Sequence, residues 1–162
     1  MNREMLISIA TGHFLIQVTR AIIDFNRIGG KDISGEEAAK LAWKFCDEIV
    51  RIANADDMIW VHDYQLMLLP GMLRKKMPRA SIGFFLHIPF PSYEVFRTLP
   101  WREELIQGIL GSDLVGFHTY DYARHFISSV KRLIGYDVEF NTIHLQNRQV
   151  CVDVFPIGND FN

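Results

Sequence analysis

Short apolar runs alternate with helical segments along most of this sequence, and this alternation limits the possible folds more than any other feature. Three runs of strand length cover residues 58–62, 81–87 and 113–117. Segments with helical spacing separate them, at residues 66–76 and 94–108. Strands that are apolar throughout and separated by helices are typical of a parallel sheet. We therefore predict an α/β fold, a parallel sheet with helices on both faces.

One domain core is predicted over residues 34–162, whereas residues 1–33 lack a regular pattern and are not assigned to it. The core opens with a capping box formed by Ser34 and Glu37. Apolar residues then follow at helical spacing as far as Ile52. A helix is therefore expected immediately before the first strand.

The pattern continues beyond the third strand with one helix and two strand-like runs. Thr119 or Asp121 is suited to cap the helix, which ends at Gly135. The two strand-like runs lie between Val138 and Phe155. The sequence therefore predicts more than three strands.

Charge and hydropathy exclude several classes of partner. With 17 basic and 19 acidic residues in 162, the chain carries a formal net charge of −2, which does not favour nucleic-acid binding. Gln17 and Arg20 interrupt the apolar stretch near the amino end, so neither a secretory signal nor a membrane partner is expected. Cys46 and Cys151 fall in a helical and a strand pattern and are expected to be free thiols. These features favour a cytoplasmic location.

Polar residues follow each of the three predicted strands. His62, Asp63 and Tyr64 end the first, His87 ends the second, and His118 follows the third. Ligands of parallel sheets bind beyond the carboxyl ends of the strands, where the loops converge. A carboxylate there is well suited to accept hydrogen bonds from sugar hydroxyls. We therefore predict a binding site at this rim of the sheet.

Two other interpretations of these residues remain open at this point. A histidine at a strand end is commonly structural, and an Asp between a strand and a helix is an ordinary helix cap. Imidazole and carboxylate groups are also suitable zinc ligands, so a metal-dependent hydrolase is an alternative. The sequence lacks the closely spaced His-x-x-x-His pair that would favour it; the residues concerned are His62, Asp63, His87 and His118.

Three sequence blocks resemble the trehalose-6-phosphate synthase family in their order and spacing. They read Trp60-Val61-His62-Asp63-Tyr64-Gln65-Leu66, His87-Ile88-Pro89-Phe90-Pro91-Ser92 and Gly116-Phe117-His118-Thr119. The resemblance runs from about Asp57 to Gly158. It implies one half of a retaining glycosyltransferase of the GT-B type, which is built from two facing Rossmann-like domains.

The resemblance also implies a reaction and a set of site residues. Glucose would pass from UDP-glucose to glucose 6-phosphate to give trehalose 6-phosphate, with no metal ion and no other cofactor. Asp63 would contact the sugars at the reaction centre, and His87 would contact the transferred glucose. Tyr64 and His118 would line the same cleft. Asp63 and His87 are thus the candidate catalytic residues.

The sequence departs from the family pattern at both ends. The family's N-terminal strand and glycine-bearing loop are not recognisable, and no sequence for the C-terminal nucleotide-binding domain follows Asn162. Asn159 also replaces the residue usual in the family's Pro-Ile-Gly-Ile-Asp block. We therefore expect a fragment of the acceptor-side domain that is inactive alone and associates with itself through uncovered surfaces. The alternative is a non-catalytic binding or regulatory module of the same fold.

Overall fold

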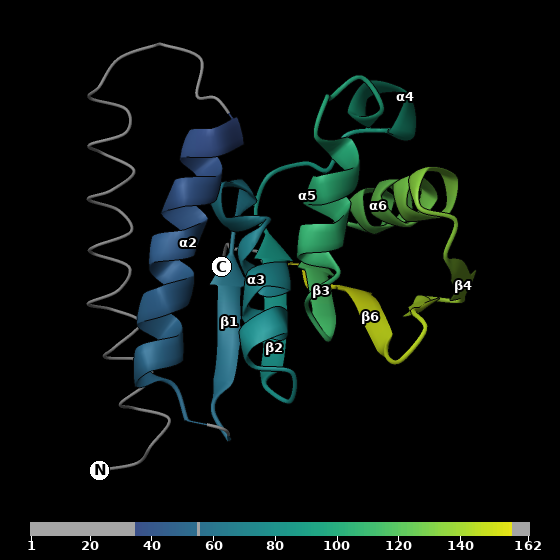
Figure 1. The fold of residues 1–162 in the computed structure, drawn as a ribbon. Coiled ribbons are helices and arrows are strands. Elements are labelled where there is room, and N and C mark those ends of the chain that lie inside the picture. The colour runs from purple at the N-terminus through teal and green to yellow at the C-terminus, as the bar shows by residue number, and fades with distance from the viewer. Residues whose placement is uncertain (1–34, 55, 157–162) are drawn as a thin grey trace, which may run out of the picture. The chain divides into compact units, whose positions relative to one another are not determined.

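The computed structural model describes residues 35–54 and 56–156, with side chains described from Ala42 onward, and Figure 1 shows the arrangement of their helices and strands. The helices are α2 (Gly35–Ile52), α3 (Leu69–Lys76), α4 (Tyr93–Phe96), α5 (Arg102–Ile109) and α6 (Tyr120–Leu133), with a short 3-10 helix η1 (Tyr64–Leu66). The strands are β1 (Met58–His62), β2 (Ser81–Leu86), β3 (Leu114–Phe117), β4 (Asp137–Glu139), β5 (Thr142–His144) and β6 (Gln149–Val154).

These strands form one mixed sheet of order β1-β2-β3-β6-β5-β4. The first four are parallel, and β5 runs antiparallel to β6 and to β4. The predicted α/β fold with a parallel core is therefore confirmed, and the three predicted strands lie within a residue of their expected bounds. The hairpin of β4 and β5 adds an antiparallel edge, a common feature of otherwise parallel sheets.

The main core lies between the sheet and the helices that connect its parallel strands. The chain passes from β1 to β2, β3 and β6 in one direction across the sheet. Because such crossovers are right-handed, α3, α5 and α6 lie over the same face, and Figure 1 shows α3 and α5 in front of the strands. Ile82, Phe84 and Leu86 point to this helix-covered face and are almost completely buried. Helices were expected on both faces of the sheet. Among the described residues, the helices that connect the parallel strands cover this face.

Aromatic rings fill the carboxyl-end half of this core. The ring centroid of Phe90 lies 4.8 Å from that of Phe96, 5.4 Å from that of Phe126 and 6.1 Å from that of Phe117. All four side chains are buried. The cluster joins the loop after β2 to α4, α6 and β3, so the packing that stabilises the fold also holds this loop in place.

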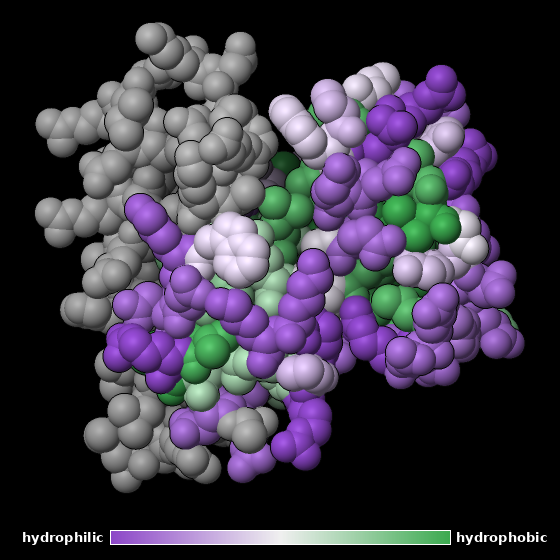
Figure 2. Space-filling model, in the orientation of Figure 1, coloured by the Kyte–Doolittle hydropathy of each residue, from purple (hydrophilic) through white to green (hydrophobic). Residues whose placement is uncertain are grey.

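The second face of the sheet is built from aromatic rings that lie over glycines. A Cβ atom on Gly83 would come within 2.5 Å of the Trp60 ring, and one on Gly116 within 2.6 Å of the Phe85 ring. Trp60 is 39% exposed and Met58, two residues earlier on β1, is 62% exposed. This face therefore presents apolar surface to solvent, unlike the helix side in Figure 2, where hydrophilic residues predominate.

Glycines also allow α3 and α5 to approach closely. A Cβ atom on Gly111, just after α5, would lie 2.2 Å from the backbone nitrogen of Gly71 in α3. A Cβ atom on Gly108 would lie 2.5 Å from the carbonyl oxygen of Met67. Both contacts are with backbone atoms, which cannot move aside as a side chain does.

The helix starts agree with the predicted caps in part. Thr119 caps α6 by accepting a hydrogen bond from the backbone N–H of Tyr122, whereas Asp121 forms an ion pair with Arg124. The helix after β1 was expected from residue 66, but α3 begins at Leu69 because η1 occupies the preceding turn. The predicted helix ending at Ile52 is confirmed as α2, and its cap residue Ser34 lies outside the described residues.

Arg74 and Arg148 hold together the turn between α5 and β3 at the amino-end edge of the parallel strands. Arg74 donates to the carbonyl oxygen of Gly111 at 3.0 Å and pairs with Asp113 at 2.7 Å. Arg148 donates to the carbonyl oxygens of Ser112 and Leu110. Burial and the nearby Arg74 lower the pKa of Arg148. Although Arg74 lies in the last turn of α3, its side chain is largely buried in this turn rather than solvated.

Cys46 is a free buried thiol in α2, and Cys151 is a free half-buried thiol in β6, as predicted. Burial raises the pKa of both thiols. Among the helices that the structure describes, none has the length and apolar character needed to cross a membrane.

Candidate functional site

Three histidines lie side by side at the carboxyl-end rim of the parallel strands. The ring centroids of His62 and His87 are 5.2 Å apart, and those of His87 and His118 are 5.5 Å apart. Each histidine has the same strand parity as Phe85, so all three lie on the second face of the sheet, the face away from α3 and α5. The structure thus brings together residues that are 25 and 31 positions apart in sequence because β1, β2 and β3 end in register.

Asp63, which follows His62 at this rim, has an unusual backbone conformation. Its φ of 69° and ψ of 170° lie in a region that non-glycine residues rarely adopt. The conformation is held from both sides, since the Asp63 backbone N–H donates to the Phe85 carbonyl at 2.8 Å and its Oδ1 accepts from the Tyr64 backbone N–H at 3.0 Å. Asp63 therefore caps η1, and its half-buried carboxylate is positioned by the sheet.

His62 and His87 share a hydrogen bond. The Nδ1 atom of His62 lies 2.9 Å from the Nε2 atom of His87, and the rings stack at an interplanar angle of 26°. Burial lowers the pKa of His62, and the neighbouring His87 lowers it further, while Asp63 acts in the opposite direction. His62 therefore favours the neutral form, which can accept a hydrogen bond.

The Phe85 ring packs against two of the three histidines, His87 and His118. Its ring centroid lies 4.7 Å from that of His87 and 5.0 Å from that of His118, with an edge contact to the latter. Phe155, at the end of β6, lies 6.5 Å from Phe85. The histidines therefore rest on an apolar platform that restricts their orientation.

The loop after β2 is held by a contact that sequence reasoning missed. Nδ1 of His125 in α6 lies 3.1 Å from the carbonyl oxygen of Phe90. These residues are 35 positions apart, and only the packing of α6 brings them together. The rim also carries the exposed side chains of Tyr64, Ile88, Tyr120 and Phe155. It is therefore a partly apolar surface around a cluster of hydrogen-bonding groups.

The rim is better suited to hydroxyl groups than to a metal ion. His62 and His87 direct ring nitrogens at each other rather than at a common point. Within residues 42–54 and 56–156, no group of three or more His, Cys, Asp or Glu side chains could hold a metal ion. Imidazole and carboxylate groups can instead form hydrogen bonds with sugar hydroxyls, which both donate and accept. The geometry therefore gives no support to the metal-dependent hydrolase.

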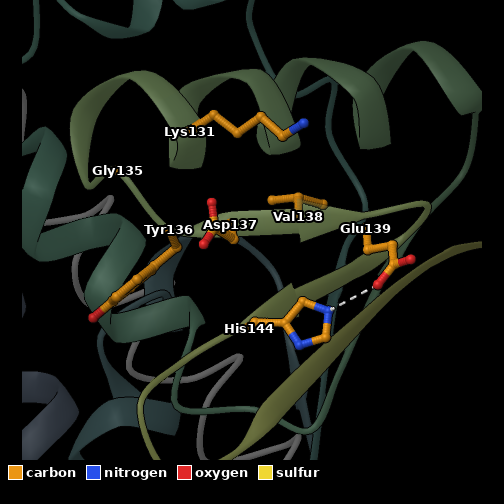
Figure 3. Close-up of a pocket in the computed structure, with 7 residues that line it drawn as sticks. All are labelled: Lys131, Gly135, Tyr136, Asp137, Val138, Glu139 and His144. Atoms are coloured by element: carbon orange, nitrogen blue, oxygen red, sulfur yellow. Dashed lines mark ion pairs between the residues drawn. The ribbon is translucent and has the colours of Figure 1, made fainter.

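A pocket of about 600 Å³ lies elsewhere, between the end of α6 and the β4–β5 hairpin. Figure 3 shows Lys131 on α6 above Glu139 of β4 and His144 of β5, with the Glu139 carboxylate 4.0 Å from His144 Nε2. His144 pairs with Gln149, the first residue of β6. The pocket is therefore at the amino-end edge of the parallel strands, away from the histidine rim.

Comparison with known proteins places the fold in a family context. Residues 36–162 match the model of glycosyltransferase family 20. A UDP-forming alpha,alpha-trehalose-phosphate synthase of Candida albicans is 57% identical over 122 residues, covering 72% of this chain and 26% of that protein. This chain thus spans about a quarter of that relative.

Two solved structures share the architecture. The N-terminal domain of Candida albicans trehalose-6-phosphate phosphatase matches with a TM-score of 0.74 and 38% identity, over 80% of this chain and 29% of that one. An alpha,alpha-trehalose-phosphate synthase (UDP-forming) of Burkholderia xenovorans in complex with glucose-6-phosphate matches with a TM-score of 0.69 and 33% identity, over 76% and 28%. Both matches cover most of this chain and under a third of the other.

Proposed function

Because this chain belongs to glycosyltransferase family 20, we propose that it is part of a retaining glucosyltransferase that makes trehalose 6-phosphate from UDP-glucose and glucose 6-phosphate. The observation that carries the proposal is the meeting of His62, Asp63, His87 and His118 at one sheet rim, where ligands of such sheets bind. The relatives named as UDP-forming synthases support the donor, and the complex of one of them with glucose-6-phosphate supports the acceptor.

We assign the site roles as follows. Asp63 accepts hydrogen bonds from sugar hydroxyls at the reaction centre, because it carries the rim's carboxylate and its backbone is held on both sides. His87 contacts the transferred glucose. Tyr64 and His118 line the cleft beside them. The reaction needs positioning and stabilisation of a departing nucleotide diphosphate, and these neutral and anionic groups supply the positioning.

The chain alone is proposed to bind weakly and to be inactive. Its rim is open to solvent, with Tyr64 51% and Tyr120 75% exposed. A rim that is open to solvent cannot exclude water or hold the leaving group. UDP-glucose serves as the donor, and no further cofactor is invoked. The two free thiols agree with a cytoplasmic location.

Binding can be tested by titrating the 15N-labelled chain with UDP-glucose and, separately, with glucose 6-phosphate. We expect backbone shifts at Asp63, His87 and His118 and no formation of trehalose 6-phosphate. Asp63→Asn should weaken these shifts, whereas His144→Asn, at the distant pocket, should not. Shifts confined to the β4–β5 hairpin, or none with either ligand, would contradict the proposal.

A second candidate is a non-catalytic binding or regulatory module. One observation favours it: the same architecture forms the N-terminal domain of a protein named as a phosphatase. Such a module would bind a sugar phosphate without a donor. Shifts at the rim with glucose 6-phosphate, together with no response to UDP-glucose at millimolar concentration, would select the module over the glucosyltransferase.

A further inference from the structure

The hydrogen bond between His62 and His87 is set up by the backbone of two neighbouring strands. His62 pairs with Phe85 in the ladder of β1 and β2. The next residue, Asp63, donates its N–H to the Phe85 carbonyl and extends this ladder by one residue. His87, two residues beyond Phe85, therefore lies diagonally across from His62 on the same face, within reach of a long side chain.

The surroundings of the two rings differ. His62 is half-buried, with the Trp60 ring 6.1 Å away and the Asp63 carboxylate next to it in sequence. His87 is exposed, with Phe85 and His118 as its other ring neighbours. Burial and the neighbouring His87 disfavour a charge on His62, and the exposed ring of His87 is the one that water can solvate. A protonated imidazole carries N–H groups at both nitrogens, so its Nε2 can only donate.

We propose that His62 is a positioning residue for His87, whose Nε2–H donates to His62 Nδ1. This arrangement serves both the neutral and the protonated form of His87 without any exchange of tautomers. It leaves Nδ1 of His87 as the ring nitrogen that has no partner within the described residues and is available to a ligand. The inference rests on the proposed function, in which His87 contacts the transferred glucose.

The consequence concerns specificity. A ring that could rotate freely would offer a hydroxyl group either a donor or an acceptor. With Nε2 occupied by His62 and the tilted Phe85 ring in contact with it, His87 presents one nitrogen at a fixed place. When His87 is neutral, this Nδ1 is an acceptor, so it selects a ligand group that donates, such as a sugar hydroxyl.

The test is the protonation of each ring nitrogen, read from long-range 1H–15N spectra of the labelled chain near pH 7.5. We expect His87 to carry its proton on Nε2 and His62 to be unprotonated at Nδ1. His62→Phe should leave His87 as a mixture of tautomers. His62→Asn should restore the single tautomer because its Oδ1 atom can accept at the position of Nδ1. His144→Asn, at the other edge of the sheet, is the matched control and should change nothing at His87.

Two results would overturn the proposal: a proton on His62 Nδ1 in the unmodified chain, or an unchanged His87 tautomer in His62→Phe. The first is read without any variant, so it decides the matter even if His62→Phe does not fold. Adding UDP-glucose to the same sample separates the two proposals. If the tautomers are as expected but UDP-glucose does not shift the His87 ring signals, the result contradicts the proposed function and supports the proposed role of His62.

Discussion

Asp63 combines a strained backbone with the proposed central role in the site. Residues in this region of φ and ψ cost about 1–3 kcal/mol and persist where the surroundings hold them. Here the holding groups are the Phe85 carbonyl and the Tyr64 N–H. Strain concentrated at a rim residue, rather than in the core, agrees with a functional reason for keeping it.

This strain predicts an unusual order of stability. Glycine normally destabilises an ordered segment relative to alanine by about 0.5–1 kcal/mol. At position 63 we expect the reverse, with Asp63→Gly more stable than Asp63→Ala by about 1 kcal/mol, since glycine relieves the strain and both lose the side-chain bond to Tyr64. Urea unfolding of both variants measures the difference. An alanine variant of equal or greater stability would show that the backbone at Asp63 is relaxed.

Asp63→Asn tests the role of the carboxylate itself. Asn caps about as well as Asp, so the free energy of unfolding should fall by well under about 1 kcal/mol. Its amide replaces one acceptor with a donor, which should cost about 1–3 kcal/mol against a sugar hydroxyl, or roughly tenfold to a hundredfold in turnover of an active form. Thermal melts and steady-state rates check the two halves. Equal turnover, or loss of folding together with activity, would show that Asp63 is structural.

His62 should make the stability of the chain depend on pH. Its pKa is lowered in the folded state from the ordinary value of 6.5, chiefly by burial. Below about pH 6.5 the unfolded chain therefore binds a proton that folded His62 does not, so stability falls as the pH falls. His62→Asn should lose this part of the dependence. The measurement is the difference in unfolding free energy between the two proteins from pH 8 to 5, and a constant difference would contradict the assignment.

At the scale of elements, the approach of α3 and α5 depends on the absence of side chains. Gly111→Ala would place a Cβ atom 2.2 Å from the Gly71 backbone, so one of the two segments must shift. Overpacking of this kind costs about 1–3 kcal/mol. Gly135→Ala is the matched control, because its φ is +80° and nothing lies within 4 Å of the added atom. It should cost only the conformational penalty of about 1–2 kcal/mol.

We expect Gly111→Ala to be the less stable of the two in urea unfolding, with changed amide signals in both α3 and α5. Signals around Gly135→Ala should change only near the end of α6. Equal destabilisation with local changes in both variants would mean that α3 and α5 are not in close contact.

At the scale of the whole molecule, the apolar second face predicts self-association. Met58 is 62% exposed, Trp60 39% and Phe155 40%, and β1 is an edge strand of the described sheet. An apolar edge strand is a ready template for pairing with another chain. Met58→Lys should therefore lower the apparent mass at high concentration in light scattering. Val95→Lys, which places the same charge at an exposed position on α4, should not.

Much of the fold and the meeting of the candidate site residues could be predicted from the sequence, because both follow from local patterns. Apolar runs mark β1, β2 and β3, and polar residues begin where each run ends. Since the carboxyl ends of parallel strands share one edge, the placement of His62, His87 and His118 at one rim followed directly. The same reasoning predicted two strand-like runs between Val138 and Phe155, but it did not show that the first is an antiparallel hairpin, because β4 and β5 have only three residues each.

The tertiary structure alone decided which of these residues touch. The bond between His62 and His87 joins positions 25 apart, and the contact between His125 and Phe90 joins positions 35 apart. Arg148 reaches the turn after α5 across 36 positions. Such contacts depend on strand register and on where each helix packs over the sheet. Local periodicity shows which side of an element is apolar, but it carries no information on which distant residue will lie against it.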